Sequence, residues 1–302
     1  MEKDNIDFKN TLKSNKIEVS ENSKKIERLK KALKIERQKS KNLRLRLNLM
    51  TQESQKALEF EILNTKLDHM NKKIINTINK TSLNATRQLE SFISLQNYLD
   101  NGTHALSFHG WPISPDIALF LVQKIEENSY DLIIEFGSGT STVILAKVIK
   151  NKQQKNLKLI TFEHKQKYYD QTLKSLKIDG LENFVDLMLT PLVEYKYKDE
   201  EFIYYSCKEK FESIKPTKRQ MKILVLVDGP PGVTCPLARF PALPHLLSVF
   251  SNQQIHLILD DYNRAEEKEI AKKWEELLEE KSILFQLESV PSEKGLYFCQ
   301  IN

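Results

Sequence analysis

A short apolar run that ends in a glycine turn, followed at once by a helical pattern, constrains this chain most. The run covers residues 131–136, the turn reads Gly137-Ser138-Gly139, and apolar residues then recur at helical spacing from Val143 to Ile149. Strand, glycine turn and helix form the opening unit of a doubly wound α/β fold. The turn leaves bare backbone where a ligand can approach closely, and the helix N-terminus offers N–H groups to an anion.

The same alternation of apolar runs and helical patterns continues to the C-terminus. We predict further buried strands over residues 157–162, 184–189, 223–227 and 255–259. The last two runs, 283–290 and 296–301, are joined by a tight turn and predict an antiparallel hairpin at the sheet edge. The predicted fold class is therefore α/β, a Rossmann-like doubly wound sheet with a C-terminal antiparallel hairpin.

Two ligands fit such a glycine turn, a dinucleotide pyrophosphate and the methionine carboxylate of S-adenosylmethionine. A dinucleotide site wants a third glycine where this chain has Thr142. Glu135 precedes the turn by two residues, where an acid suits an ammonium group and repels a pyrophosphate. Glu163 ends the next strand, where a carboxylate can accept both ribose hydroxyls. The alternative interpretation is that both are ordinary surface acids at strand ends.

Residues 134–142 resemble motif I of the class I S-adenosylmethionine-dependent methyltransferases, and the resemblance extends over roughly residues 105–302. It includes residues 111–115, 227–232, 259–262 and 293–295. The chain is most similar to small-molecule and sugar O-methyltransferases often found among bacterial glycan genes. The resemblance implies S-adenosylmethionine as the cofactor, with Glu163 at the ribose and His164 beside the adenine. It implies contacts to the rest of the cofactor from Glu135, Gly137, Ser138, Gly139, Thr140, Ser141 and Asp228.

Three acids also sit where some metal-dependent O-methyltransferases bind Mg²⁺. Asp228 follows the strand at 223–227, and Asp260 and Asp261 follow the strand at 255–259. Together they could hold Mg²⁺ and favour the alkoxide of a substrate hydroxyl. The chain departs from that pattern after Asp228, because Gly229-Pro230-Pro231 offers no Lys or Asp as a base. The alternative is that Asp228 orders its loop and Asp260 caps the following helix.

The segment 239–245 would then face the pocket. Arg239 is the candidate for binding an anionic or sugar acceptor, and His245 is the candidate general base. The predicted catalytic residues are therefore Asp228, Arg239 and His245.

The first 80 residues differ in composition from the rest of the chain. They contain 20 Lys and Arg, 11 Asp and Glu, and neither glycine nor proline. From Ile26 to Ile78 apolar residues step by three and four, with polar residues at some positions and a three-residue step from Ala57 to Phe60. This pattern predicts a long α-helical coiled-coil arm over residues 1–100, ahead of a methyltransferase domain over 101–302. Because one helix cannot bury such a stripe, we expect a homo-oligomer formed through the arm.

The basic charge of the arm fits a solvated coiled-coil face better than a nucleic-acid site, because no aromatic residues are interleaved with it. The alternating run 43–47 is the candidate for a peripheral membrane contact. The N-terminus lacks the apolar core of a signal peptide, no window approaches a membrane span, and the three cysteines are scattered. These features predict a cytoplasmic location.

The functional prediction is an S-adenosylmethionine-dependent methyltransferase that O-methylates a sugar, glycan or other small acceptor. An NAD-linked oxidoreductase is the first alternative, and Thr142 disfavours it. A coiled-coil scaffold carrying a degenerate nucleotide-binding domain is the second, and the intact glycine turn with its two acids disfavours that.

Overall fold

The computed structural model describes residues 27, 29–43, 55–99, 108, 112–153, 157–214 and 220–302. It divides into two compact units, Met1–Lys80 and Thr81–Asn302, which are described separately. Part of the predicted seam lies outside the described residues or side chains, namely Ile26, Leu47, Met50, Ala57 and Phe60. Residues 44–47 of the alternating run and Trp111 also lie outside them.

The first unit is helical wherever it is described. Residues 29–43 form a helix, and α2 (Gln55–Leu99) is continuous over 45 residues. In this unit the seam residues Leu63, Leu67 and Ile74 are half-buried, whereas Met70 and Ile78 are about half exposed. A long helix ahead of the sheet is confirmed over Gln55–Leu99, and its pairing in a coiled coil stays a prediction. Within the described residues, no helix combines the length and the apolar character needed to cross a membrane.

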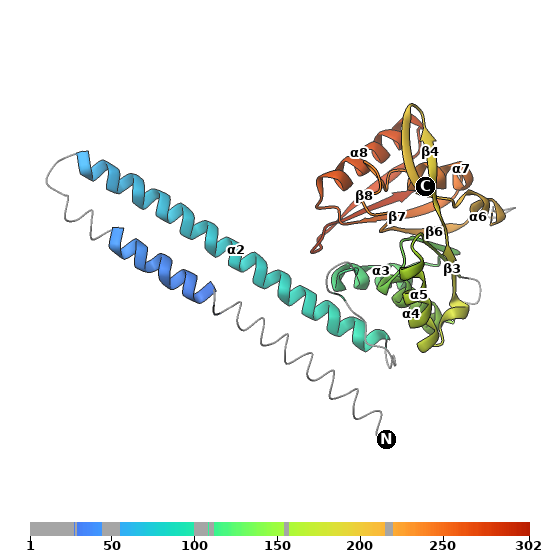
Figure 1. The fold of residues 1–302 in the computed structure, drawn as a ribbon, viewed down its shortest axis with the longest axis horizontal. Helices are drawn as coiled ribbons and strands as arrows, with labels where there is room; N and C mark the ends of the chain where they lie inside the picture. The colour runs from blue at the N-terminus through green and yellow to red at the C-terminus, as the bar shows by residue number, and fades with distance from the viewer. Residues whose placement is uncertain are drawn as a thin grey trace, which may run out of the picture. The chain divides into compact units, whose positions relative to one another are not determined.

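The second unit contains a seven-stranded sheet in the order β3-β2-β1-β6-β7-β9-β8 (Figure 1). β1, β2, β3, β6 and β7 are parallel, and β9 pairs antiparallel with both β7 and β8. The predicted Rossmann-like sheet and its C-terminal hairpin are therefore confirmed. The strands are β1 (Leu132–Phe136), β2 (Lys158–Glu163), β3 (Val185–Leu189), β6 (Lys222–Val227), β7 (Gln254–Asp260), β8 (Phe285–Val290) and β9 (Leu296–Ile301).

Helices cover both faces of this sheet, because its central strands β1, β2, β6 and β7 are buried on both sides. Ile133, Leu224 and Ile258 point into a cluster with α3 (Pro115–Glu127) and α4 (Thr140–Lys152). Ile134, Val225 and Leu257 point the other way, toward α7 (Ala242–Phe250) and α8 (Ala265–Glu280). The remaining helices of this unit are α5 (Gln166–Ile178), η1 (Glu182–Phe184) and α6 (Lys208–Ser213).

A separate hairpin that the sequence analysis did not predict follows β3. It consists of β4 (Leu192–Tyr197) and β5 (Glu200–Tyr205), joined by a tight turn in which Lys198 has φ 53°. Phe202, Tyr204 and Tyr205 are buried in the same cluster as α7 and α8. The hairpin therefore adds aromatic side chains to one face of the second unit.

The C-terminal part of α2 belongs to the second unit. Leu95 and Leu99 are buried in the cluster with α3 and α4, and the Gln88 side chain accepts the backbone N–H of Asp116. The domain boundary that we predict at residue 100 falls after α2, whereas the compact unit already begins at Thr81.

The sheet order places a switch point between β1 and β6. From β1 the chain continues outward through β2 and β3, and from β6 it continues in the opposite direction to β7. Ligands of open α/β sheets bind outside the carboxyl ends of strands at such a point. Most of the predicted site residues follow these carboxyl ends.

Candidate active site

The glycine turn after β1 is pressed against the loop after β6. Gly137 has φ 95°, and a Cβ added to it would lie 2.9 Å from the carbonyl oxygen of Asp228. The Gly137 N–H donates to the Phe162 carbonyl and the Asp228 N–H donates to the Phe136 carbonyl, both at 2.9 Å. Backbone contacts thus hold the carboxyl ends of β1, β2 and β6 together.

Thr142, which replaces the third glycine of a dinucleotide motif, organises the start of α4. Its hydroxyl accepts the Gly139 N–H at 3.0 Å and donates to Glu135 Oε2 at 2.6 Å. Thr140 and Ser141 form the first turn of this helix, where the positive end of the helix dipole lies. Among the described residues, no heavy atom lies within 4 Å of a Cβ added to Gly139, so this part of the chain leaves open space beside the helix N-terminus.

Glu135 is fully buried next to this turn. Its Oε2 accepts hydrogen bonds from Thr142 and from Thr161 at 2.6 and 2.8 Å. Its Oε1 has no hydrogen-bond partner among the described residues. Burial raises the pKa of Glu135 to about 7, although the hydroxyls of Ser141, Thr142 and Thr161 oppose that shift. A buried carboxylate with one unsatisfied oxygen is suited to receive a cationic group.

Glu163 at the end of β2 is buried, and both of its carboxylate oxygens accept hydrogen bonds. Its Oε2 accepts the Ser138 N–H and hydroxyl, both at 3.1 Å, and its Oε1 accepts the Lys165 N–H at 2.8 Å. Burial opposes ionisation, but the His164 ring and these backbone donors outweigh it and lower the pKa of Glu163. Glu163 is therefore an ionised group that fixes the turn, and its ribose contact stays a prediction.

His164 and Tyr205 lie side by side next to these acids. The two rings are 5.8 Å apart in an edge-to-face arrangement. The Tyr205 hydroxyl is buried without a hydrogen-bond partner among the described residues, 2.5 Å from where a Cβ on Gly229 would lie. Tyr205 could not be predicted from the sequence, because its only signal is an aromatic run in the unpredicted hairpin β4-β5.

The three acids predicted as metal ligands are brought together. One carboxylate oxygen from each of Asp228, Asp260 and Asp261 lies within 4.8 Å of the other two. Asp260 Oδ1 accepts the Asp261 N–H at 2.7 Å, and Asp261 has φ 61°. Burial raises the pKa of Asp228 to about 6 and that of Asp260 to about 8. We call Asp228, Asp260 and Asp261 the acid cluster.

Arg239 is buried against the acid cluster, with only 4% of its surface exposed. Its Nη2 lies 3.2 Å from Asp228 Oδ1 and 3.3 Å from Asp261 Oδ2, and its Nη1 donates to the Asp260 carbonyl at 3.1 Å. Both terminal nitrogens of the guanidinium are thus already engaged by the protein. Its predicted contact with an acceptor stays a prediction.

His245 lies on α7, and its described ring contacts are with two tyrosines of the hairpin. The ring centroid is 4.2 Å from that of Tyr195 and 5.8 Å from that of Tyr204. Burial, together with the charge of Lys208, lowers the pKa of His245 to about 4. The structure does not show His245 in contact with the acid cluster, and its role as a base stays a prediction.

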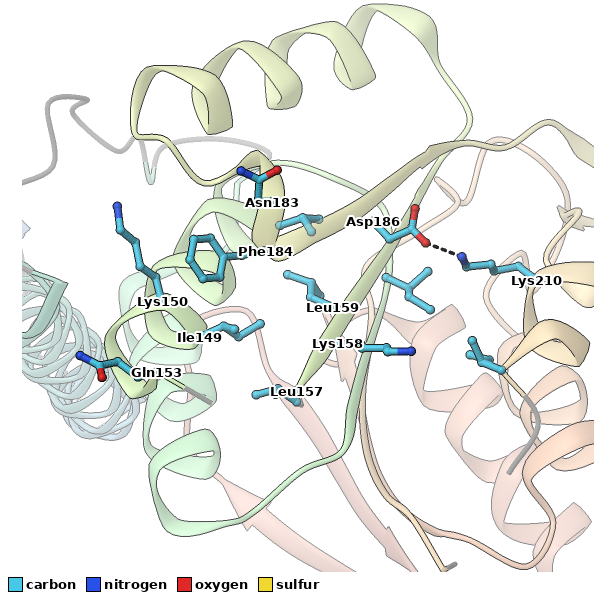
Figure 2. Close-up of a pocket in the computed structure, with 13 residues that line it drawn as sticks. Ile149, Lys150, Gln153, Leu157, Lys158, Leu159, Asn183, Phe184, Asp186 and Lys210 are labelled. Carbon is cyan, nitrogen blue, oxygen red and sulfur yellow. Dashed lines mark hydrogen bonds and ion pairs between the residues drawn. The ribbon is translucent and has the colours of Figure 1, made fainter. Parts of the chain in front are cut away.

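A hollow at the amino ends of the strands, opposite the candidate site, is lined by none of the predicted site residues. It lies between the C-terminal end of α4 and the first residues of β2 and β3, and Figure 2 shows Lys210 pointing at Asp186 across it. The candidate site therefore remains the one at the carboxyl ends of the strands.

Comparisons with known proteins find remote structural similarity alone. No protein-family model matches the chain, and no curated protein does. An O-methyltransferase from Bacillus cereus, solved with S-adenosylhomocysteine, is 13% identical, with 72% of this chain and 91% of that chain covered and a TM-score of 0.44. A Podospora anserina methyltransferase bound to S-adenosylhomocysteine is 13% identical, with 72% and 88% covered and a TM-score of 0.45.

A third solved structure has the same level of similarity. The O-methyltransferase TomG of Streptomyces achromogenes, involved in tomaymycin synthesis and solved with S-adenosylmethionine, is 13% identical, with 71% and 87% covered and a TM-score of 0.44. Similarity this remote supports no conclusion about activity or acceptor, which depend on the site itself.

Proposed function

We propose that this chain is an S-adenosylmethionine-dependent methyltransferase. The observation that carries the proposal is the buried Oε1 of Glu135 beside the N-terminus of α4, which has no hydrogen-bond partner among the described residues. The methionine end of S-adenosylmethionine carries an ammonium and a carboxylate on one carbon. Glu135 supplies the partner for the ammonium, and the N–H groups of the glycine turn and α4 supply the partner for the carboxylate.

The same contacts argue against a dinucleotide. A pyrophosphate at this turn would place two negative charges next to a buried carboxylate, at a cost in electrostatic free energy. The position of the third glycine is filled by Thr142, whose hydroxyl donates to Glu135. We therefore favour a zwitterionic ligand over a dianionic one.

For the chemical step we propose transfer to the oxygen of a sugar, glycan or other small acceptor, with Asp228 as the base. Asp228 lies at the switch point, and its side chain is 22% exposed. A carboxylate whose pKa burial raises to about 6 can accept a proton from a hydroxyl near neutral pH. The acceptor oxygen attacks the methyl carbon as its proton passes to Asp228. The carbon–sulfur bond breaks, and its electron pair stays on sulfur to leave S-adenosylhomocysteine.

Cofactor choice is tested by calorimetry on the full chain. We expect S-adenosylhomocysteine to bind with a Kd on the order of micromolar, and NAD and NADH to give no heat of binding. The reason is that Glu135 favours an ammonium and opposes a pyrophosphate. Tight NAD binding with no response to S-adenosylhomocysteine would exclude the methyltransferase proposal.

We also propose that the arm joins copies of the chain. Replacing the half-buried Leu63 and Leu67 with glutamate should dissociate the assembly, because unpaired carboxylates on a helix seam are costly to bury. Asn76→Glu with Asn79→Glu is the matched control, since both positions are exposed and gain the same charge. Light scattering measures the mass. A wild-type chain that is monomeric at tens of micromolar would contradict the proposal.

A further inference from the structure

The acid cluster is paired with a cation that the chain itself supplies, the guanidinium of Arg239. Asp228, Asp260 and Asp261 are the residue types and the arrangement that would suit a divalent metal ion. We propose that Arg239 takes the place of that metal ion, so that the site needs no bound metal. The metal affinity of the site can be measured without turnover.

The first support is the position of the guanidinium. Its Nη2 is nearly equidistant from Asp228 Oδ1 and Asp261 Oδ2, at 3.2 and 3.3 Å. One nitrogen therefore bridges two carboxylates that a metal ion would also have to bridge. Mg²⁺ requires oxygen ligands at about 2.0–2.1 Å in a nearly octahedral shell, and these oxygens already accept N–H donors.

The second support is that the main chain holds Arg239 in place. Its Nη1 donates to the carbonyl of Asp260 at the end of β7, and its Nη2 lies 3.4 Å from the carbonyl of Asp228 after β6. Swinging the side chain out would break these contacts and expose a group that is now 4% exposed. Arg239 thus ties the ends of two neighbouring strands together, a structural task that a shared metal ion would otherwise perform.

The third support is the arrangement of charges around the guanidinium. Buried Glu267 at the start of α8 lies 3.8 Å from Arg239 Nη1, so acids face this arginine from three elements. Arg264 reaches Asp261 and Glu267 from outside, but it is about half exposed. Among the described cations that form ion pairs with these acids, Arg239 is the buried one, and its removal should create an excess of buried negative charge that attracts a dication.

The experiment compares binding of Mn²⁺, a spectroscopic substitute for Mg²⁺, to the wild-type chain, Arg239→Met and Arg264→Met. Electron paramagnetic resonance measures free Mn²⁺, and thermal unfolding measures stability with and without the ion. We expect the wild type and Arg264→Met to bind Mn²⁺ no more tightly than millimolar. Arg239→Met should bind at least about 10-fold more tightly and should gain several degrees of Tm from the ion.

The outcomes separate the two cations. Micromolar Mn²⁺ binding by the wild type, abolished by Asp261→Asn, would overturn the proposal and assign the cluster to a metal. If Arg239→Met fails to fold, the wild-type titration still decides. Transfer that is lost in EDTA and restored by Mg²⁺ would overturn it as well, whereas a failure to bind S-adenosylhomocysteine would affect only the proposed function.

Discussion

Glu135→Gln is expected to weaken S-adenosylhomocysteine binding by at least about 30-fold while making the protein more stable at pH 8. The loss of binding follows because removing one partner of a buried ion pair costs about 2–5 kcal/mol. Glutamine keeps a carbonyl oxygen that can accept the hydroxyls of Thr142 and Thr161, now bonded to Glu135 Oε2. The change therefore removes the charge and leaves the packing and most hydrogen bonds in place.

The gain in stability follows from the raised pKa of Glu135. The pKa of Glu135 is about 7 in the folded state, and its ordinary value is 4.5. Between pH 4.5 and about pH 7 the folded state therefore keeps a proton that the unfolded chain has already released. The free energy of unfolding therefore falls as pH rises from about 4.5 to about 7, by about 3 kcal/mol, and the deficit persists at pH 8. The glutamine side chain cannot ionise, so the variant escapes this loss, and the two proteins should converge near pH 4.5.

Glu163→Gln is the matched control, and its effect on stability has the opposite sign. The pKa of Glu163 is lowered in the folded state, so its ionisation stabilises the fold above its ordinary pKa. The variant should lose Tm at pH 8, where Glu135→Gln gains it. Thermal unfolding across pH, with calorimetry of S-adenosylhomocysteine, measures both. Wild-type affinity in Glu135→Gln would show that no ammonium binds at this acid.

The pH dependence of cofactor binding in the wild type follows from the same pKa. A ligand ammonium requires the ionised form of Glu135, so affinity should rise as pH increases through about 7. The ligand in turn should lower the pKa of Glu135, so binding below pH 7 should release a proton. Calorimetry in buffers of different ionisation enthalpy detects that release.

The central part of the fold could be predicted because each strand is followed by its own local signal. The run Leu132–Phe136 is apolar throughout except for Glu135 and ends in glycine, and it forms a buried strand with a turn whose Gly137 has positive φ. The placement of Glu135, Glu163 and Asp228 at strand ends followed from these boundaries. Because β1, β2 and β6 are parallel, their carboxyl ends, and with them these three acids, lie at the same end of the sheet.

The remaining features depend on contacts between distant segments. The apolar residues Leu95 and Leu99 belong to the predicted arm by pattern, yet they are buried against α3 and α4. Arg239 is far in sequence from Asp260 and follows no strand, so no periodicity places its guanidinium among carboxylates. Tyr205 is brought beside His164 by the β4-β5 hairpin, whose strands are short and half-exposed.

The glycine turn packs against the loop after β6 and leaves space for the proposed ligand. Gly137→Ala and Gly139→Ala are expected to separate these two tasks. At Gly137 a Cβ would lie 2.9 Å from the Asp228 carbonyl oxygen and 3.2 Å from its carbon, and φ is 95°. Both the crowding and the backbone conformation oppose a side chain there, at a combined cost of about 2–4 kcal/mol. Because backbone meets backbone, the β1 turn and the β6 loop must move apart, and both Tm and cofactor affinity should fall.

Gly180→Ala isolates the conformational part of that cost, because Gly180 has φ 61° but open space around an added Cβ. Its loss of Tm should be smaller than that of Gly137→Ala, and its affinity for S-adenosylhomocysteine should match the wild type.

Gly139→Ala should behave in the opposite way, because its Cβ meets no atom of the described residues within 4 Å and its backbone is extended. We expect an unchanged Tm and a loss of S-adenosylhomocysteine affinity of about 10- to 100-fold, since the methyl group occupies space the proposed methionine carboxylate requires. Thermal unfolding and calorimetry on the same samples distinguish the two glycines. Full affinity in Gly139→Ala would mean that no ligand approaches the turn at this residue. Glu135 would then have to find its cationic partner from another direction.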